Sequence, residues 1–229
     1  RFLARHLYSF FVADEPHVSS WQVTPPIDPD AIQSLVDAYN ESHGDIRSIL
    51  RVLFNSEFFK NARFARVKCP AELIVGTVRM VGNYNGFMPG FNNLALECGW
   101  QGQELLNPPS VEGWHTGSEW IDPGVLMRRI NFAARILGDT SIPGVQAIIK
   151  RVLVEGLAQG NLSPQAIVAA CLDTMGPLEV SEATRAELMA HAEKDSELSW
   201  NTNEELRATV GKVSKILTLI AASREYQFA

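Results

Sequence analysis

The stretch that decides the fold class is TNEELRATVGKVSKILTLI, residues 202–220. It opens with Thr202 and Glu205, the spacing of a capping box, in which a hydroxyl and a carboxylate satisfy the unpaired N–H groups at a helix start. Apolar residues then recur three or four positions apart, at Leu206, Val210, Val213, Leu217 and Ile220. This is the period of one helix face, so the stretch is predicted to form an amphipathic helix with a buried side.

Signals of helix starts and ends recur along the rest of the chain. Further helices are predicted after the capping residues Asp28, Asp45, Ser163 and Ser181, and from the prolines Pro70, Pro89, Pro123 and Pro143. Two of them are predicted to end at Gly138 and Gly176. Strand-like alternation is nearly absent. We therefore predict an all-α, multi-helix, bundle-like domain of about nine or ten helices, with a long ordered loop.

Apolar spacing also predicts which side chains face the core. The predicted inward residues of the first two capped helices are Ile32, Leu35, Val36, Tyr39, Ile46, Ile49, Leu50 and Leu53.

Two similar helix ends suggest two related halves, with a weak boundary near Gly138–Gly144. Residues 1–138 are predicted to form a helical core that carries the loop 99–121. Residues 139–229 are predicted to form a C-terminal helical subdomain packed on that core.

The charge pattern excludes one class of partner. Lysine and arginine total 20 and aspartate and glutamate 26, a net charge of -6. Much of the excess lies in residues 179–205, where eight acidic residues face two basic ones, as expected of a solvated helix face. Nucleic-acid binding depends on clustered positive charge that releases counterions, and the chain has no such cluster. We expect no DNA or RNA partner.

Cysteines and chain ends say little about where the protein works. The three cysteines match no zinc or haem spacing, and Cys98 and Cys171 lie in apolar helical patterns that predict burial. An exported chain could join two of them, and the sequence does not say whether Cys69, Cys98 or Cys171 form a disulfide. No apolar run reaches the about 18 residues of a membrane span, and no signal segment is present. The opening RFLARHLYSFF, residues 1–11, begins in mid-helix, so we expect a fragment of a longer protein.

One segment stands out from the helical pattern. Residues 99–121, GWQGQELLNPPSVEGWHTGSEWI, hold three of the five tryptophans, two prolines and four glycines. Pro108 and Pro109 block a helix, and Gly113 and Gly117 permit backbone angles that other residues resist. A loop this long is typically either functional or packed on itself. Both interpretations stay open: a packed loop that fills the gap between helices, or a binding surface built on tryptophan.

The segment also carries a family resemblance. The runs KCPAELIVGTVR (68–79) and GQELLNPPSVEGWHTGSEWI (102–121), followed by Arg128 and Arg129, resemble the bacterial family called domain of unknown function eighteen hundred. The matching motif positions are Lys68, Pro70, Glu72, Gly102, Gln103, Pro108, Pro109, Val111, Gly113, Trp114 and Trp120. The resemblance implies no established activity. It implies an exported protein, periplasmic or secreted, encoded beside a possible partner protein.

No complete catalytic motif is present. The zinc-protease, nucleophile-elbow, phosphate-loop and dinucleotide-binding patterns are all missing, and we predict no metal and no cofactor. Weak catalytic candidates are Glu72 and His115, with Glu119 or Asp122 as a second acid. Glu72 and Arg79 lie seven residues apart on one predicted helix face. They form either a charged pair beneath the loop or structural contacts that hold it.

Three functions fit the sequence. The first is a binding or assembly module that acts with a partner protein through the loop. The alternatives are a hydrolase-like enzyme and a carbohydrate-binding protein that uses the tryptophans, and the sequence does not decide whether the protein is an enzyme. The predicted binding residues are Trp114, Trp120, Gln103, Lys68 and Arg79.

Overall fold

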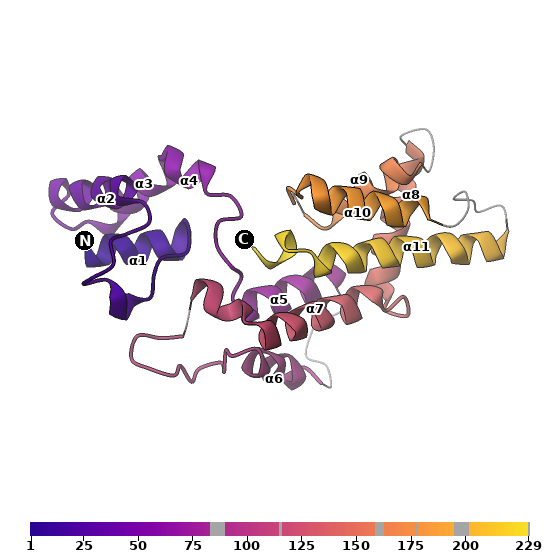
Figure 1. Ribbon diagram of the computed structural model, residues 1–229, viewed down its shortest axis with the longest axis horizontal. Coiled ribbons are helices and arrows are strands. Elements are labelled where there is room, and N and C mark those ends of the chain that lie inside the picture. The colour runs from indigo at the N-terminus through magenta and orange to yellow at the C-terminus, as the bar shows by residue number, and fades with distance from the viewer. Residues whose placement is uncertain (83–89, 115, 159–162, 177, 195–201, 229) are drawn as a thin grey trace. The chain divides into compact units, whose positions relative to one another are not determined.

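The computed structural model of the chain confirms the all-α fold class (Figure 1). It describes residues 1–82, 90–114, 116–158, 163–176, 178–194 and 202–228. Within these ranges there are eleven α-helices and three short 3-10 helices, and β-type pairing is limited to two isolated bridges. The helices group into two compact units, each of which has its own buried core.

The first unit comprises Arg1–Cys69, Leu105–Asp122 and Phe228–Ala229. Its helices are α1 (Phe2–Phe11), η1 (Val18–Ser20), α2 (Pro29–Glu41), α3 (Ile46–Asn55), α4 (Glu57–Asn61) and η2 (Gly117–Ile121). Helix α2 packs against both α1 and α3. Their shared core is apolar, with Tyr8, Leu35 and Leu53 among its buried side chains. Burial of this kind is the main favourable term that holds three short helices together.

Local signals set the helix starts of this unit as predicted. Asp28 caps α2 by accepting from the N–H of Ala31, and Asp45 caps α3 by accepting from that of Ser48. Two predicted core positions are wrong, because Tyr39 and Ile46 are exposed. Ile46 is the first residue of α3, where the helix has not yet reached the core.

Tyr39 is exposed because its ring lies against the turn that ends α2. A Cβ built on Gly44 would lie 3.5 Å from the Tyr39 ring. Gly44 has a φ of 85°, in the left-handed region that glycine adopts at little cost. The ring therefore covers a helix end instead of filling the core, a contact that helical periodicity does not predict.

The second unit comprises Pro70–Glu104 and Pro123–Gln227. Its helices are α5 (Pro70–Val81), α6 (Asn92–Trp100), α7 (Pro123–Gly138), α8 (Pro143–Ala158), α9 (Pro164–Thr174), α10 (Glu182–Glu193), α11 (Asn203–Ala222) and η3 (Glu225–Gln227). Helix α11 packs against α7, α8, α9 and α10, so it is the central element of this unit (Figure 1). The boundary predicted after residue 138 falls inside this unit.

The predicted helix signals of the second unit are largely confirmed. Thr202 and Glu205 form the capping box at the start of α11. Ser163 caps α9, and Gly176, with a φ of 109°, follows its end. Pro89, the predicted start of another helix, lies outside the described residues, and α6 begins at Asn92.

Close packing and burial complete the second unit. A Cβ on Gly144 would overlap the carbonyl group of Val81, so the start of α8 touches the backbone at the end of α5. Cys98 and Cys171 are buried as predicted, and none of the three cysteines forms a disulfide. Burial raises the pKa of the Cys171 thiol to about 12. Among the helices that the structure describes, none is long and apolar enough to cross a membrane.

Candidate functional site

The first residues of the tryptophan-rich segment have a structural role in the second unit. Gly102 has a φ of 95° and follows α6, and the Gln103 N–H donates to the carbonyl of Cys98 at 2.8 Å. This arrangement ends a helix with a left-handed residue, usually glycine. The side-chain oxygen of Gln103 then accepts from the N–H of Ala71 at 2.8 Å, in the first turn of α5. One dipeptide therefore ends α6 and caps α5.

The following residues are exposed. Residues 105–112, which we name the exposed arm, are all exposed to solvent. The exposed fractions of Leu106 and Val111 are 97% and 106%, so neither side chain packs against the protein. Leu106 also has a φ of 64°, a left-handed backbone angle that is unfavourable for a branched side chain. The exposed arm thus combines two costly features, bare aliphatic side chains and backbone strain.

A tight turn at the end of the exposed arm fixes the direction of its side chains. The Gly113 N–H donates to the Ser110 carbonyl at 3.1 Å, and the Glu112 N–H donates to the Ser110 hydroxyl at 3.2 Å. Gly113 has a φ of 99°, which glycine adopts readily. Val111 and Glu112 are therefore the two corner residues of this turn.

The last part of the segment is anchored to the first unit. Trp120, in η2, is only 4% exposed. A Cβ on Gly117 would lie 3.2 Å from the Asp14 side chain, so the chain passes close to that residue. Asp14 also accepts from the N–H of Val67 at 2.8 Å. Asp14 therefore fixes both the anchored part of the segment and the chain near residue 67.

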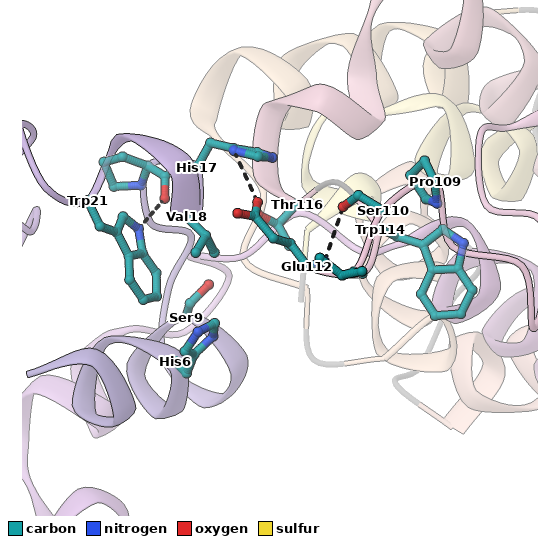
Figure 2. A pocket seen from close by; sticks show the side chains of 13 residues that line it. His6, Ser9, His17, Val18, Trp21, Pro109, Ser110, Glu112, Trp114 and Thr116 are labelled. Atoms are coloured by element: carbon teal, nitrogen blue, oxygen red, sulfur yellow. Dashed lines mark hydrogen bonds and ion pairs between the residues drawn. The ribbon is translucent and has the colours of Figure 1, made fainter.

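A pocket of about 470 Å³ lies in the first unit, between α1, η1 and the turn of the exposed arm (Figure 2). Its lining residues are His6, Ser9, Pro16, His17, Val18, Trp21, Pro109, Ser110, Val111, Glu112, Gly113, Trp114 and Thr116. His6 and Ser9 lie three residues apart on α1, so they share a face of that helix. Figure 2 shows Glu112 extending toward the His17 ring, and Trp114 extending away from both histidines.

A buried ion pair holds the wall of this pocket. Arg5 of α1 lies 2.7 Å from Glu15, and both side chains are almost fully buried. Glu15 also accepts from the N–H of Ile27 at 2.9 Å, and the Arg5 guanidinium lies 4.6 Å from the centre of the Trp21 ring. These contacts fix the chain from residue 15 to residue 27 against α1. Sequence reasoning missed both charged residues, because spacing alone does not show that a charge is buried.

The two histidines of the pocket, His6 and His17, have different surroundings. Burial lowers the pKa of His6, although the nearby Glu112 carboxylate opposes that shift. His17 Nδ1 lies 2.7 Å from the Ser19 hydroxyl and accepts from the Ser19 N–H at 3.4 Å. The same atom lies 4.0 Å from the Glu112 carboxylate.

The predicted site residues divide between the two units. In the first unit, Trp114 is half-buried and lines the pocket, Trp120 is buried in the protein, and Lys68 is half-buried. In the second unit, Gln103 is buried, whereas Glu72 and Arg79 are exposed on α5. His115 lies outside the described residues.

The exposed side chain of Trp100 lies beside Arg128, which lines a second, smaller pocket in the second unit. Arg128 of α7 forms an ion pair with Glu97 of α6 at 3.0 Å and lies 4.4 Å from the centre of the Trp100 ring. The pocket beside them measures about 400 Å³. Because Arg128 is paired with Glu97 and stacked on Trp100, this arrangement fits a contact that joins α6 to α7.

Metal binding is not supported by the described residues. Among them, no three histidine, cysteine, aspartate or glutamate side chains lie close enough together to hold a metal ion. The lining of the pocket in the first unit instead offers hydrogen-bonding groups that include a carboxylate, three hydroxyls and two imidazole rings. Its chemistry is that of a binding site for a polar or charged group.

Comparison with known proteins identifies the family. The family model described as "Protein of unknown function (DUF1800)" matches residues 1–228. The chain therefore belongs to this family, as its motif residues predict. Searches of curated proteins and of solved structures give no match.

Proposed function

We propose that this DUF1800 protein is a binding module that docks a partner protein through its exposed arm, residues 105–112. The single observation that carries the proposal is the full exposure of Leu106 and Val111 within one short loop. Burying an aliphatic side chain of this size is worth about 1.5–3 kcal/mol, and neither residue gains that energy within the chain. A partner surface with an apolar depression would supply it.

The backbone of the exposed arm supports the same function. Strain at a non-glycine residue with positive φ is commonly retained where a site needs a particular geometry. Leu106 meets that description with a φ of 64°. At the other end, the turn closed by Gly113 holds Val111 at a corner, where it projects away from the protein. The arm thus presents its two aliphatic residues in a defined conformation, which lowers the entropy lost on binding.

The exposed arm favours docking over the two alternatives. The described part of the chain adds no partner for a catalytic Glu72 in either pocket, because Glu72 is exposed on α5 and lines neither of them. Stacking on a sugar requires an open tryptophan face. Both Arg5 and His6 contact the Trp21 ring, and Trp120 is buried. Trp100 is exposed, but Arg128 lies over its ring, 4.4 Å from the centre.

The test compares capture by three proteins expressed in the native host. They are the wild type, a double variant Leu106→Asp with Val111→Asp, and the matched control Val23→Asp. Val23 is 86% exposed in the same unit but lies outside the arm. We expect the wild type and the control to capture the same protein, encoded nearby, and the double variant to lose it. Equal capture by all three would overturn the proposal.

Two further measurements make that test specific. Surface substitutions usually change the free energy of unfolding by no more than about 0.5 kcal/mol, so all three melting temperatures should agree closely. A photo-crosslinking amino acid at position 106 should attach the captured protein covalently, whereas the same group at position 23 should not.

We also propose, from the resemblance to exported bacterial family members, that the protein works outside the cytoplasm. Fractionation of the native host, with the genomic copy tagged at its C-terminus, tests the location. Recovery in the periplasmic or secreted fraction is expected, and recovery with the cytoplasm would contradict it.

A further inference from the structure

Three polar side chains of the pocket in the first unit have unused hydrogen-bonding capacity. Among the described residues, none donates to or accepts from the His6 ring, the Ser9 hydroxyl or the Glu112 carboxylate within hydrogen-bond distance. They come from segments about a hundred residues apart in the chain, α1 and the turn of the exposed arm. Each can accept a hydrogen bond: the carboxylate, the hydroxyl and one nitrogen of a neutral imidazole.

The charge of the pocket is negative. Among the lining residues that the structure describes, only Glu112 has a formal charge when the histidines are neutral. Residues 102–122 hold four acids and no lysine or arginine. The nearest buried cation, Arg5, is paired with Glu15 at 2.7 Å, so it does not compensate Glu112.

His6 does not supply the missing positive charge at neutral pH. Burial lowers the pKa of His6, so its ring is neutral there. His17 presents Nδ1 to Glu112 at 4.0 Å, and that nitrogen already accepts the N–H of Ser19. At 4.0 Å, this contact lies beyond hydrogen-bond distance. Glu112 has a half-exposed carboxylate beside acceptors, and a cation is its natural complement.

We propose that this pocket receives an arginine side chain of the protein that docks on the exposed arm. The inference rests on the proposed docking function and names the chemistry of one contact within it. A guanidinium group has five N–H donors and no acceptor, which complements three acceptors and one negative charge. The ammonium group of lysine has only three donors and a more strongly held hydration shell.

The geometry of the turn links this contact to docking. Val111 and Glu112 are adjacent corner residues, so a partner segment that covers Val111 lies next to the pocket. A volume of about 470 Å³ accommodates an arginine side chain with accompanying water. The partner's apolar contact with the arm and its arginine in the pocket would thus be neighbours on one surface.

The first experiment needs no partner. N-acetyl-arginine amide and its neutral analogue N-acetyl-citrulline amide are titrated into the protein, with binding followed by chemical shifts in NMR spectra. We expect saturable, millimolar-range binding of the arginine probe and binding of the citrulline probe at least roughly tenfold weaker, because a charge-assisted hydrogen bond is lost. Equal binding of both probes, or no binding of the arginine probe, would overturn the proposal.

Two variants test whether binding of the arginine probe depends on Glu112. Glu112→Gln keeps the shape of the side chain and should weaken the arginine probe by roughly tenfold or more. The matched control Glu41→Gln removes an exposed carboxylate from the same unit but outside the pocket, and should leave binding unchanged. Unchanged binding in Glu112→Gln, or the same loss in both variants, would contradict a site at Glu112. Both replaced side chains lie at the surface, so folding should not be affected.

The same titration separates this inference from the docking function. The single variant Leu106→Asp, if it no longer captures the partner, should still bind the arginine probe, because Leu106 is outside the pocket and Glu112 is unchanged. Loss of partner capture in that variant, with no probe binding in the wild type, would retain docking and reject the arginine pocket. Probe binding that depends on Glu112, with capture unaffected by the arm, would retain a cation pocket but reject its place in docking.

Discussion

The exposed arm and η2 come from the same tryptophan-rich segment but differ in the burial of their apolar side chains. In η2, Trp120 is buried, and Gly117 passes close to Asp14. In the exposed arm, Leu106 and Val111 contact solvent. Composition marks the whole segment as unusual, yet a neighbouring element decides which part is buried. The comparison indicates that one part stabilises the fold and leaves the other available for binding.

The largest expected effect comes from removing the buried tryptophan. Trp120→Ala should lower the free energy of unfolding by roughly 3–5 kcal/mol, because it deletes a large side chain from a packed site. Thermal and chemical denaturation followed by circular dichroism measure this loss. Trp120 is also one of the residues predicted to bind a partner, and its burial shows that it packs within the first unit.

Leu106→Ala is the matched control in the exposed arm. Its side chain packs against nothing, so the free energy of unfolding should change by no more than about 0.5 kcal/mol. If the two variants lose the same stability, the contrast between the two parts of the segment is wrong.

The two glutamates near the pocket give the next largest contrast. Glu15 is buried against Arg5, whereas Glu112 is half-exposed. Glu15→Gln should cost roughly 3 kcal/mol of stability, because it leaves the buried guanidinium without its counter-charge. Glu112→Gln should leave stability nearly unchanged. Urea denaturation of both variants tests the pair, and equal losses would show that Glu112 is part of the folding core.

Sequence signals predicted the fold far better than the site. Caps such as Asp28 and Thr202 act through hydrogen bonds three residues away, so their effect is visible in the local sequence. The pocket requires His6 and Glu112 to meet across about a hundred residues, which no local spacing encodes. The motif did locate the segment, but it could not show that Gln103 and Trp114 belong to different units.

Replacing Gln103 should lower the free energy of unfolding by less than replacing Trp120 or Glu15. Its side chain accepts from the N–H of Ala71 at the start of α5. Gln103→Ala should lower the free energy of unfolding by about 1 kcal/mol, the usual cost of a lost cap. Gln103→Glu keeps an acceptor oxygen and places negative charge at a helix N-terminus, where it is favourable. Gln103→Glu should therefore lower the free energy of unfolding by less than Gln103→Ala. A larger loss in Gln103→Glu than in Gln103→Ala would contradict the capping role.

The smallest expected change in stability is a gain. Leu106 has a φ of 64°, and asparagine adopts that backbone conformation more readily than leucine. Leu106→Asn should therefore raise the free energy of unfolding by about 0.5 kcal/mol, while it removes an aliphatic side chain that the proposed docking would use. Precise thermal melts and capture of the same neighbouring protein are measured together. A gain in stability with a loss of capture would show that the strain is retained for binding. Unchanged capture would mean that the backbone of the arm, and not the Leu106 side chain, makes the contact.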